Sequence, residues 1–98
     1  MLIIRETFQI HPDKMKAAKE SVKFMLGLSE HLEPKVTMRA MFDVVADFYT
    51  MIFETEVESL QQMEEIYAQT MQLKEWQEWY PTFRPCIVSG KREVFMLL

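Results

Sequence analysis

Several residue types are scarce in this 98-residue chain, and each scarcity excludes a class of protein. The single cysteine, Cys86, can form neither an internal disulfide nor a cysteine-based zinc site. Two glycines and four prolines leave no flexible linker and no low-complexity tract. The apolar run from Met1 to Ile4 stops at Arg5, which makes it too short for a signal sequence or a membrane span. We therefore expect a cytoplasmic protein with no membrane partner.

The charge and the lack of known motifs exclude further functions. A net charge of −4 argues against binding to nucleic acids or to anionic membranes. The sequence contains no glycine-rich phosphate loop, no serine-nucleophile elbow and no Walker-type motif. His11 and His31 are the only histidines and have no further ligands spaced around them, so we predict no metal site, and we expect no cofactor. His11 is still a candidate acid or base, although two isolated histidines form no triad and a surface or capping role is favoured.

Hydrophobic periodicity divides the chain, residues 1–98, into the elements of a single domain. Residues 2–10 alternate with a period of two, which predicts a strand with one buried face. From Asp13 the period becomes helical and continues to Pro34, which ends the helix. Residues 35–45 and 49–57 alternate again and predict a hairpin with a short turn near residues 46–47. The residues that share the first helical stripe are Met15, Ala18, Val22, Met25 and Leu32.

The last third of the chain predicts one helix and one strand. Ser59 and Gln62 have the spacing of a capping box, which begins a second helix. Its apolar stripe slips near residues 71–73, and Pro81 and Pro85 bracket a stretch that we expect to be irregular. The final strand is predicted from about residue 92 to residue 98. The inward positions of the second helix are Leu60, Met63, Ile66, Tyr67 and Thr70.

This order of elements predicts an α+β, ferredoxin-like β-α-β-β-α-β fold. Right-handed crossovers place both helices on one face of a four-stranded antiparallel sheet. The other face is half apolar, and an exposed sheet face of that kind is an association surface. We therefore predict a homodimer in which two bare sheet faces meet and enclose a barrel. The apolar residues predicted on that face are Ile3, Met41, Ile52, Phe95 and Leu97.

Four segments spread over nearly the whole chain carry a resemblance to a known superfamily. They are the opening strand 2–10, the Glu33-Pro34 turn, the segment from Phe53-Glu54 to Glu58-Ser59-Leu60, and the closing Arg92-Glu93-Val94-Phe95 strand. In these segments the chain resembles the dimeric α/β-barrel superfamily, in particular antibiotic-biosynthesis-monooxygenase-like and NIPSNAP-like domains. The resemblance implies a small-molecule-binding protein, or a cofactor-independent monooxygenase or isomerase, acting on an aromatic or apolar ligand in the barrel cavity. The alternative is a non-catalytic homodimeric binding module.

The chain departs from this superfamily at positions that bear on catalysis. Related oxygenases often carry a histidine in the second helix, but none occurs between Ser59 and Pro81. Members that degrade haem use an asparagine, a tryptophan and a histidine, whereas this sequence has no asparagine. The departures disfavour haem degradation and leave open whether the protein is an enzyme.

Charged and aromatic residues supply the candidate site. The charged residues among the candidates share the predicted bare face. They form either ion pairs that fix the dimer's register or a cavity whose arginines bind a carboxylate or phenolate. The aromatic set either packs in the core or closes a pocket over an aromatic ligand. We place the site between the bare face and the C-terminal region of the second helix. The predicted ligand-binding residues are Arg5, Arg39, Asp43, Glu54, Trp76, Trp79 and Tyr80, and the catalytic candidates are Asp43, Arg39 and His11.

Overall fold

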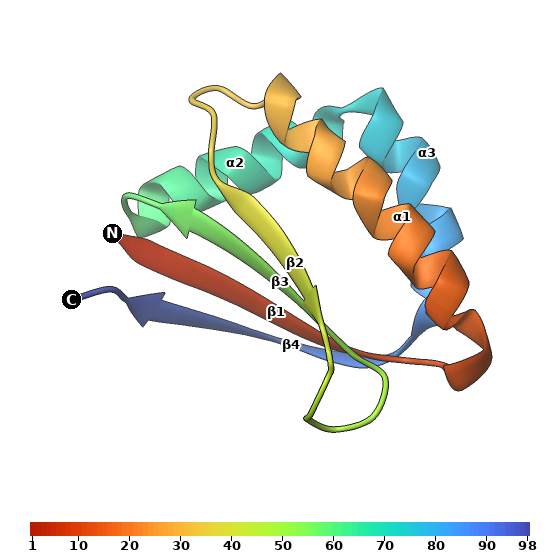
Figure 1. Ribbon diagram of the computed structural model, residues 1–98. Coiled ribbons are helices and arrows are strands. Elements are labelled where there is room, and N and C mark those ends of the chain that lie inside the picture. The colour runs from red at the N-terminus through yellow and green to blue at the C-terminus, as the bar shows by residue number, and fades with distance from the viewer.

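The computed structural model describes all residues, 1–98. It contains four strands and three helices, with strands at both ends of the chain (Figure 1). In chain order they are β1 (Leu2–Ile10), α1 (Met15–Leu28), β2 (Met38–Phe42), β3 (Thr50–Val57), α2 (Leu60–Gln72), α3 (Lys74–Phe83) and β4 (Ile87–Met96). No helix has the length and the apolar content needed to cross a membrane.

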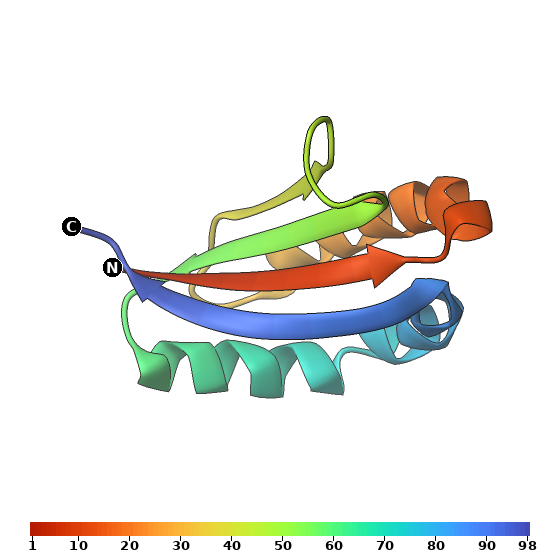
Figure 2. The same cartoon turned by 90° about the horizontal axis from the view of Figure 1, so that it is seen from below.

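The strands form one antiparallel sheet in the order β2-β3-β1-β4. Figure 1 shows the three helices on one side of this sheet, and in Figure 2, seen from below, the strands lie in front of α1 and no helix crosses the near face. Because neighbouring residues of a strand point to opposite faces, the register assigns every side chain to the helix-covered face or to the bare face. Ile4 lies opposite Thr55 of β3 and Val94 of β4, on the covered face. The predicted α+β, ferredoxin-like sheet is confirmed.

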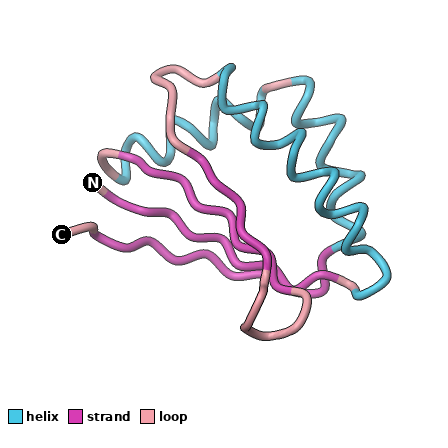
Figure 3. The backbone as a smooth tube through the Cα atoms, in the orientation of Figure 1, coloured by secondary structure: helices cyan, strands magenta, loops and turns pink.

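The core lies at the end of the sheet where α1 and α3 cross it (Figure 3). Ala18 and Val22 are one turn apart on α1, so the small and branched side chains of this stripe meet the sheet together. They pack against Phe53 of β3 and Phe83 of α3. Seven buried residues make up this core: Ile10, Ala18, Val22, Met51, Phe53, Phe83 and Cys86.

The hairpin between β2 and β3 has a longer loop than its sequence predicts. Residues 43–49 connect the strands, and Val44 and Val45 are almost fully exposed instead of continuing β2. Asp43 organises this loop: its Oδ1 atom accepts a hydrogen bond from the Thr50 amide at 2.9 Å. The predicted extension of this strand to residue 45 is wrong, because Asp43 caps the loop and alternation alone does not distinguish it from a strand residue.

The segment around Pro81 and Pro85 is regular, contrary to the prediction. A third helix runs through Pro81 to Phe83 and is followed by a short 3₁₀ turn. β4 then begins at Ile87, five residues before the predicted start. The sequence does not indicate this start, because Ser89 and Gly90 interrupt the apolar alternation in the first half of β4. The pairing of β4 with β1 also shifts at Ile10. The sheet is therefore covered by three helices rather than two.

Candidate functional site

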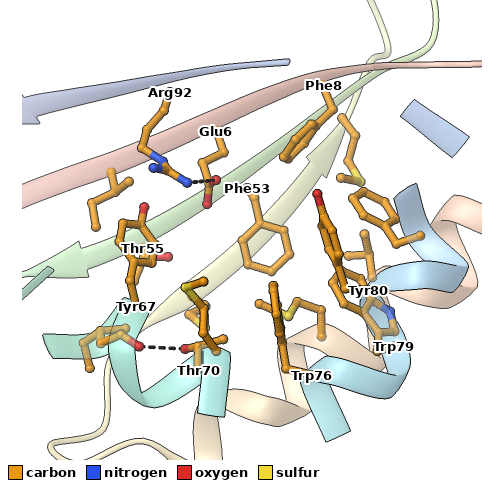
Figure 4. A pocket seen from close by; sticks show the side chains of 18 of the residues that line it. Glu6, Phe8, Phe53, Thr55, Tyr67, Thr70, Trp76, Trp79, Tyr80 and Arg92 are labelled. Atoms are coloured by element: carbon orange, nitrogen blue, oxygen red, sulfur yellow. Dashed lines mark hydrogen bonds and ion pairs between the residues drawn. The ribbon is translucent and has the colours of Figure 1, made fainter. Parts of the chain in front are cut away.

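A pocket of about 540 Å³ lies between the covered face of the sheet and the three helices (Figure 4). This volume is within the range of small-molecule sites. Fifteen of its nineteen lining residues are hydrophobic. The strands supply Ile4, Glu6, Phe8, Met38, Met51, Phe53, Thr55, Ile87 and Arg92, and the helices supply Val22, Met25, Ile66, Tyr67, Thr70, Met71, Trp76, Trp79, Tyr80 and Phe83.

Aromatic side chains of α3 form one end of the pocket. Trp76 stacks on Tyr80 with ring centroids 5.0 Å apart, and Trp79 stacks on Phe83 at 4.9 Å. The residues of each pair are four positions apart, so helical geometry brings them to the same side of α3. The indole nitrogen of Trp79 donates a hydrogen bond to the main-chain oxygen of Ser21 at 2.9 Å, which fastens α3 to α1. The aromatic end is therefore held in place by both packing and a hydrogen bond.

Phe8 closes the aromatic end on the sheet side because β4 has no side chain opposite it. Gly90 is the partner of Phe8 in the register, and a Cβ atom at this position would lie 2.9 Å from the phenyl ring. The absent side chain lets the ring of Phe8 meet Phe83 edge-on, with centroids 5.7 Å apart. Gly90 thus has a packing role at this close approach.

Charged residues on two neighbouring strands form the other end. Glu6 of β1 and Arg92 of β4 lie opposite each other in the register, both on the covered face. An Nη2 atom of Arg92 donates to Oε2 of Glu6 at 3.1 Å. The same guanidinium lies over the ring of Tyr67, 4.5 Å from its centroid, so that β4 contacts α2 through a cation–π interaction. Figure 4 shows these three side chains at the end opposite Trp79 and Tyr80.

The hydroxyl of Tyr67 is buried at this end and has no hydrogen-bond partner in the protein. Burial raises the pKa of Tyr67 to about 12; the Glu6 carboxylate adds to the rise and Arg92 opposes it. The phenol is therefore neutral at physiological pH. Its donor and its acceptor are both unused by the rest of the protein.

A second charged cluster lies on the bare face of the sheet, around Glu54. Arg5 donates through Nε to Oε2 of this carboxylate at 2.6 Å, and Arg39 contacts Oε1 through Nε and Nη2 at 2.8 and 2.6 Å. Burial acts to raise the pKa of Glu54, but the hydrogen bonds and charges of Arg39 and Arg5 outweigh it and hold the pKa below its ordinary value. With both oxygens occupied by arginines, Glu54 is poorly suited to act as a base.

The predicted site residues are divided between the two faces of the sheet. Trp76, Trp79 and Tyr80 line the pocket on the helix side. The other predicted set, Arg5, Arg39 and Glu54, lines a separate groove on the bare face, so the structure does not bring the two sets together in one hollow. The separation follows from the topology, since the second helix covers the face opposite these charges.

The two other catalytic candidates lie away from both hollows. Asp43 caps the β2–β3 loop. His11 is exposed at the end of β1, where its amide donates to the main-chain oxygen of Cys86 at 2.9 Å. Neither residue lines the pocket or the bare-face groove. Their geometry supports a structural role for Asp43 and gives His11 no partner for acid–base chemistry.

Sequence reasoning missed the polar end of the pocket, formed by Glu6, Tyr67 and Arg92. A signal was present, because Glu6 occupies an inward position between Ile4 and Phe8 in an otherwise apolar alternation. A charged residue at such a position requires a partner. The structure supplies Arg92, which is eighty-six positions away in the sequence. No group of three or more potential metal-ligating side chains comes together in the structure.

Solved structures with this fold include two NIPSNAP proteins and a monooxygenase. A NIPSNAP domain protein from Burkholderia xenovorans is 13% identical over 100% of this chain and 95% of its own, with a TM-score of 0.87. A NIPSNAP family protein from Agrobacterium tumefaciens is 13% identical over 99% and 85%, with a TM-score of 0.89. An antibiotic biosynthesis monooxygenase is 12% identical over 100% and 99%, with a TM-score of 0.76.

These likenesses confirm the fold that the sequence resemblance implied. At such identities they establish the fold alone. No protein-family model and no curated protein matches the sequence.

Proposed function

We propose that the protein binds a small, mainly apolar aromatic molecule in the pocket between the sheet and the helices. The observation that supports this best is the division of the pocket into an aromatic end on α3 and a polar end at Glu6, Tyr67 and Arg92. Small-molecule sites are typically apolar hollows in which a few polar groups fix the orientation of the ligand. The ligand would lie along the pocket with its ring system against Trp76 and Tyr80.

A cofactor-independent monooxygenase or isomerase is the catalytic form of this proposal. Its support is the fold shared with an antibiotic biosynthesis monooxygenase and the position of Glu6, the only carboxylate that lines the pocket. Glu6 would accept a proton from the ligand, and Arg92 would stabilise the resulting anion. In an isomerase the proton returns to another atom of the ligand. In an oxygenase, dioxygen would convert a ligand methylene to a carbonyl, and the second oxygen atom would leave as water.

A non-catalytic homodimeric module is the second candidate, and the bare face of the sheet favours it. Met41, Phe95 and Leu97 are exposed there beside the Arg5–Glu54–Arg39 cluster. We propose that two copies associate through this face and that the cluster fixes their register. Association and ligand binding use opposite faces of the sheet, so the two candidates are compatible.

Binding of naphthalene tests the proposed pocket, because this two-ring hydrocarbon has no polar group. We expect Trp76→Ala to weaken binding about tenfold, since it removes one ring of the stacked wall and the area that it buries. Fluorescence titration measures the affinity. Phe24→Ala is the matched control: Phe24 is a half-exposed aromatic of α1 that does not line the pocket.

Two results would count against parts of this proposal. Equal affinities for the two variants would contradict a site at the aromatic end. A lack of dioxygen consumption with two-ring aromatic substrates, measured with an oxygen electrode, would contradict the oxygenase form of the proposal.

A further inference from the structure

We propose that Glu6 sets the charge preference of the pocket: by occupying Arg92, it makes the polar end accept a neutral hydroxyl or carbonyl group and refuse a carboxylate. This inference rests on the proposed binding function and names the class of ligand. The class is an aromatic molecule with one uncharged oxygen-bearing group. The inference also assigns Glu6 as the residue that determines specificity.

The charged residues of the pocket wall balance each other. Among the nineteen lining residues, only Glu6 and Arg92 carry a charge, and their charges are opposite. Arg92 taken alone would make the polar end an attractive site for a carboxylate. The Glu6 oxygen lies 3.1 Å from the Arg92 nitrogen, so any anion that approaches the guanidinium also approaches a carboxylate. The attraction and the repulsion therefore offset each other.

Removing a ligand's charge from water has a cost. A carboxylate that enters a mainly apolar pocket loses its hydration and needs a full compensating interaction. Arg92 offers only part of such an interaction, because its guanidinium already donates to Glu6 and lies over the ring of Tyr67. A neutral oxygen loses much less hydration on entering. The balance at this end therefore favours an uncharged group.

The hydroxyl of Tyr67 is unpaired. This phenol is buried without a partner and remains protonated, so it can donate to a carbonyl oxygen and can donate to or accept from a hydroxyl group. A buried polar atom gains most from a hydrogen bond when nothing else in the protein satisfies it. The Glu6–Arg92 pair, which disfavours an anion, thus lies beside the Tyr67 hydroxyl, which favours a neutral oxygen.

Three ligands that share one ring system test the inference at pH 7: naphthalene, 2-naphthol, which is neutral, and 2-naphthoate, which is ionised. We expect the wild-type protein to bind 2-naphthol about fivefold more tightly than naphthalene, because of one added hydrogen bond. We expect 2-naphthoate to bind more weakly than 2-naphthol. Tyr67→Phe should remove the advantage of 2-naphthol over naphthalene.

Glu6→Gln supplies the decisive comparison because it keeps the shape of the side chain and leaves Arg92 without an ionised partner. The ratio of the 2-naphthoate affinity to the naphthalene affinity should rise about tenfold. Adding Arg92→Met to Glu6→Gln should abolish this gain. Its loss would show that the guanidinium binds the carboxylate.

Each outcome separates this inference from the proposed function. If naphthalene does not bind, the proposed function fails and the inference fails with it. If naphthalene binds but the wild type prefers 2-naphthoate to 2-naphthol, only the inference is overturned, and this result needs no variant that could misfold. An unchanged ratio of the 2-naphthoate affinity to the naphthalene affinity in a folded Glu6→Gln variant overturns it as well.

Discussion

At the residue scale, the two charged clusters differ in how completely their polar groups are satisfied. Glu54 on the bare face has an arginine on each carboxylate oxygen. In the pocket, the Tyr67 hydroxyl has no partner, although it is just as inaccessible to solvent. An unsatisfied buried group reduces stability, and such groups occur where a binding site is held ready for a ligand. This contrast assigns the first cluster to stability and supports the proposal that the second binds a ligand.

Removing the Tyr67 hydroxyl should stabilise the ligand-free protein. Tyr67→Phe keeps the ring under Arg92 and deletes the group that is buried without a hydrogen bond. We expect the free energy of unfolding to rise by about 1 kcal/mol, measured by urea denaturation. The control is Tyr80→Phe, since Tyr80 is more exposed and should show a change near zero. A loss of stability in Tyr67→Phe would mean that the hydroxyl is satisfied in solution.

The cluster at Glu54 should make stability depend on acid pH. The pKa of Glu54 is lower in the folded protein than its ordinary value of 4.5, because the arginines outweigh the effect of burial. The stabilisation is therefore complete above pH 4.5 and is lost as the pH falls through the lowered pKa of the folded state. Glu54→Gln should cost about 1–3 kcal/mol at pH 7 and lose less on acidification than the wild type.

Urea denaturation at pH 7 and at a series of values below pH 4.5 measures this difference. Glu56→Gln is the control, because Glu56 lies on the same face of β3 and forms no ion pair. Parallel pH curves for the wild type and Glu54→Gln would contradict the role assigned to the two arginines.

At the element scale, α2 forms one side of the pocket and makes side-chain hydrogen bonds near both of its ends. Ser59 caps its start by accepting a hydrogen bond from the Gln62 amide at 3.1 Å. Near its other end, the side-chain amide of Gln69 exchanges two hydrogen bonds with the main chain of Glu33. Between these ends, Tyr67 under Arg92 is the polar contact with the sheet. The position of α2 therefore depends on a few identifiable contacts.

Loss of the cap should loosen α2 before it affects the sheet. Ser59→Ala removes the acceptor for an amide of the first turn, at a cost of about 1 kcal/mol. Hydrogen exchange should accelerate in the first turn of α2 and remain unchanged in β1 and β3. Ser89→Ala is the control, because Ser89 is exposed on β4 and its side chain forms no hydrogen bond. Uniform acceleration in all elements would indicate global destabilisation instead.

The elements that the sequence predicted well are those whose periodicity comes from a single buried face. The first strand was predicted with its observed bounds, and the capping residue of α2 was identified from Ser59 and Gln62. The turn residues were harder, since Asp43 ends β2 through a hydrogen bond that alternation does not reveal. Pro81 and Pro85 predict an irregular stretch between them, but Pro81 lies inside α3 close to the end of that helix. Local rules fail where a tertiary contact decides the outcome.

The candidate site was less predictable than the fold because it depends on long-range pairing. The aromatic end could be found in the sequence, since Trp76, Trp79 and Tyr80 lie within one helix. The polar end joins Glu6 to Arg92 across the two ends of the chain, and only the strand register brings them together. The same register places Arg5 and Arg39 on the opposite face, away from these aromatics. The alternation along a strand predicts which residues share a face of the sheet. Predicting the site also requires knowing which helix covers that face.

At the scale of the whole molecule, the bare face of the sheet predicts association. The helices leave this face uncovered (Figure 2). It presents apolar side chains around the satisfied Glu54 cluster. Ion pairs that are already complete within one copy can be buried against a second copy without leaving an unpaired charge. A second sheet stacked about 10 Å away would remove both apolar surfaces from water. We therefore expect a dimer at micromolar concentration.

Phe95→Glu tests this association with the least disturbance to the fold. Phe95 is 43% exposed on the bare face, so its replacement leaves no cavity in the core, but a dimer would have to bury the new carboxylate twice. Light scattering should give the mass of a dimer for the wild type and of a monomer for the variant. Phe24→Glu is the matched control, because Phe24 is 47% exposed on the helix side and its replacement should leave the mass unchanged. A monomeric wild type would refute the dimer, and the naphthalene affinity of Phe95→Glu would still report on the pocket, which lies on the other face of the sheet.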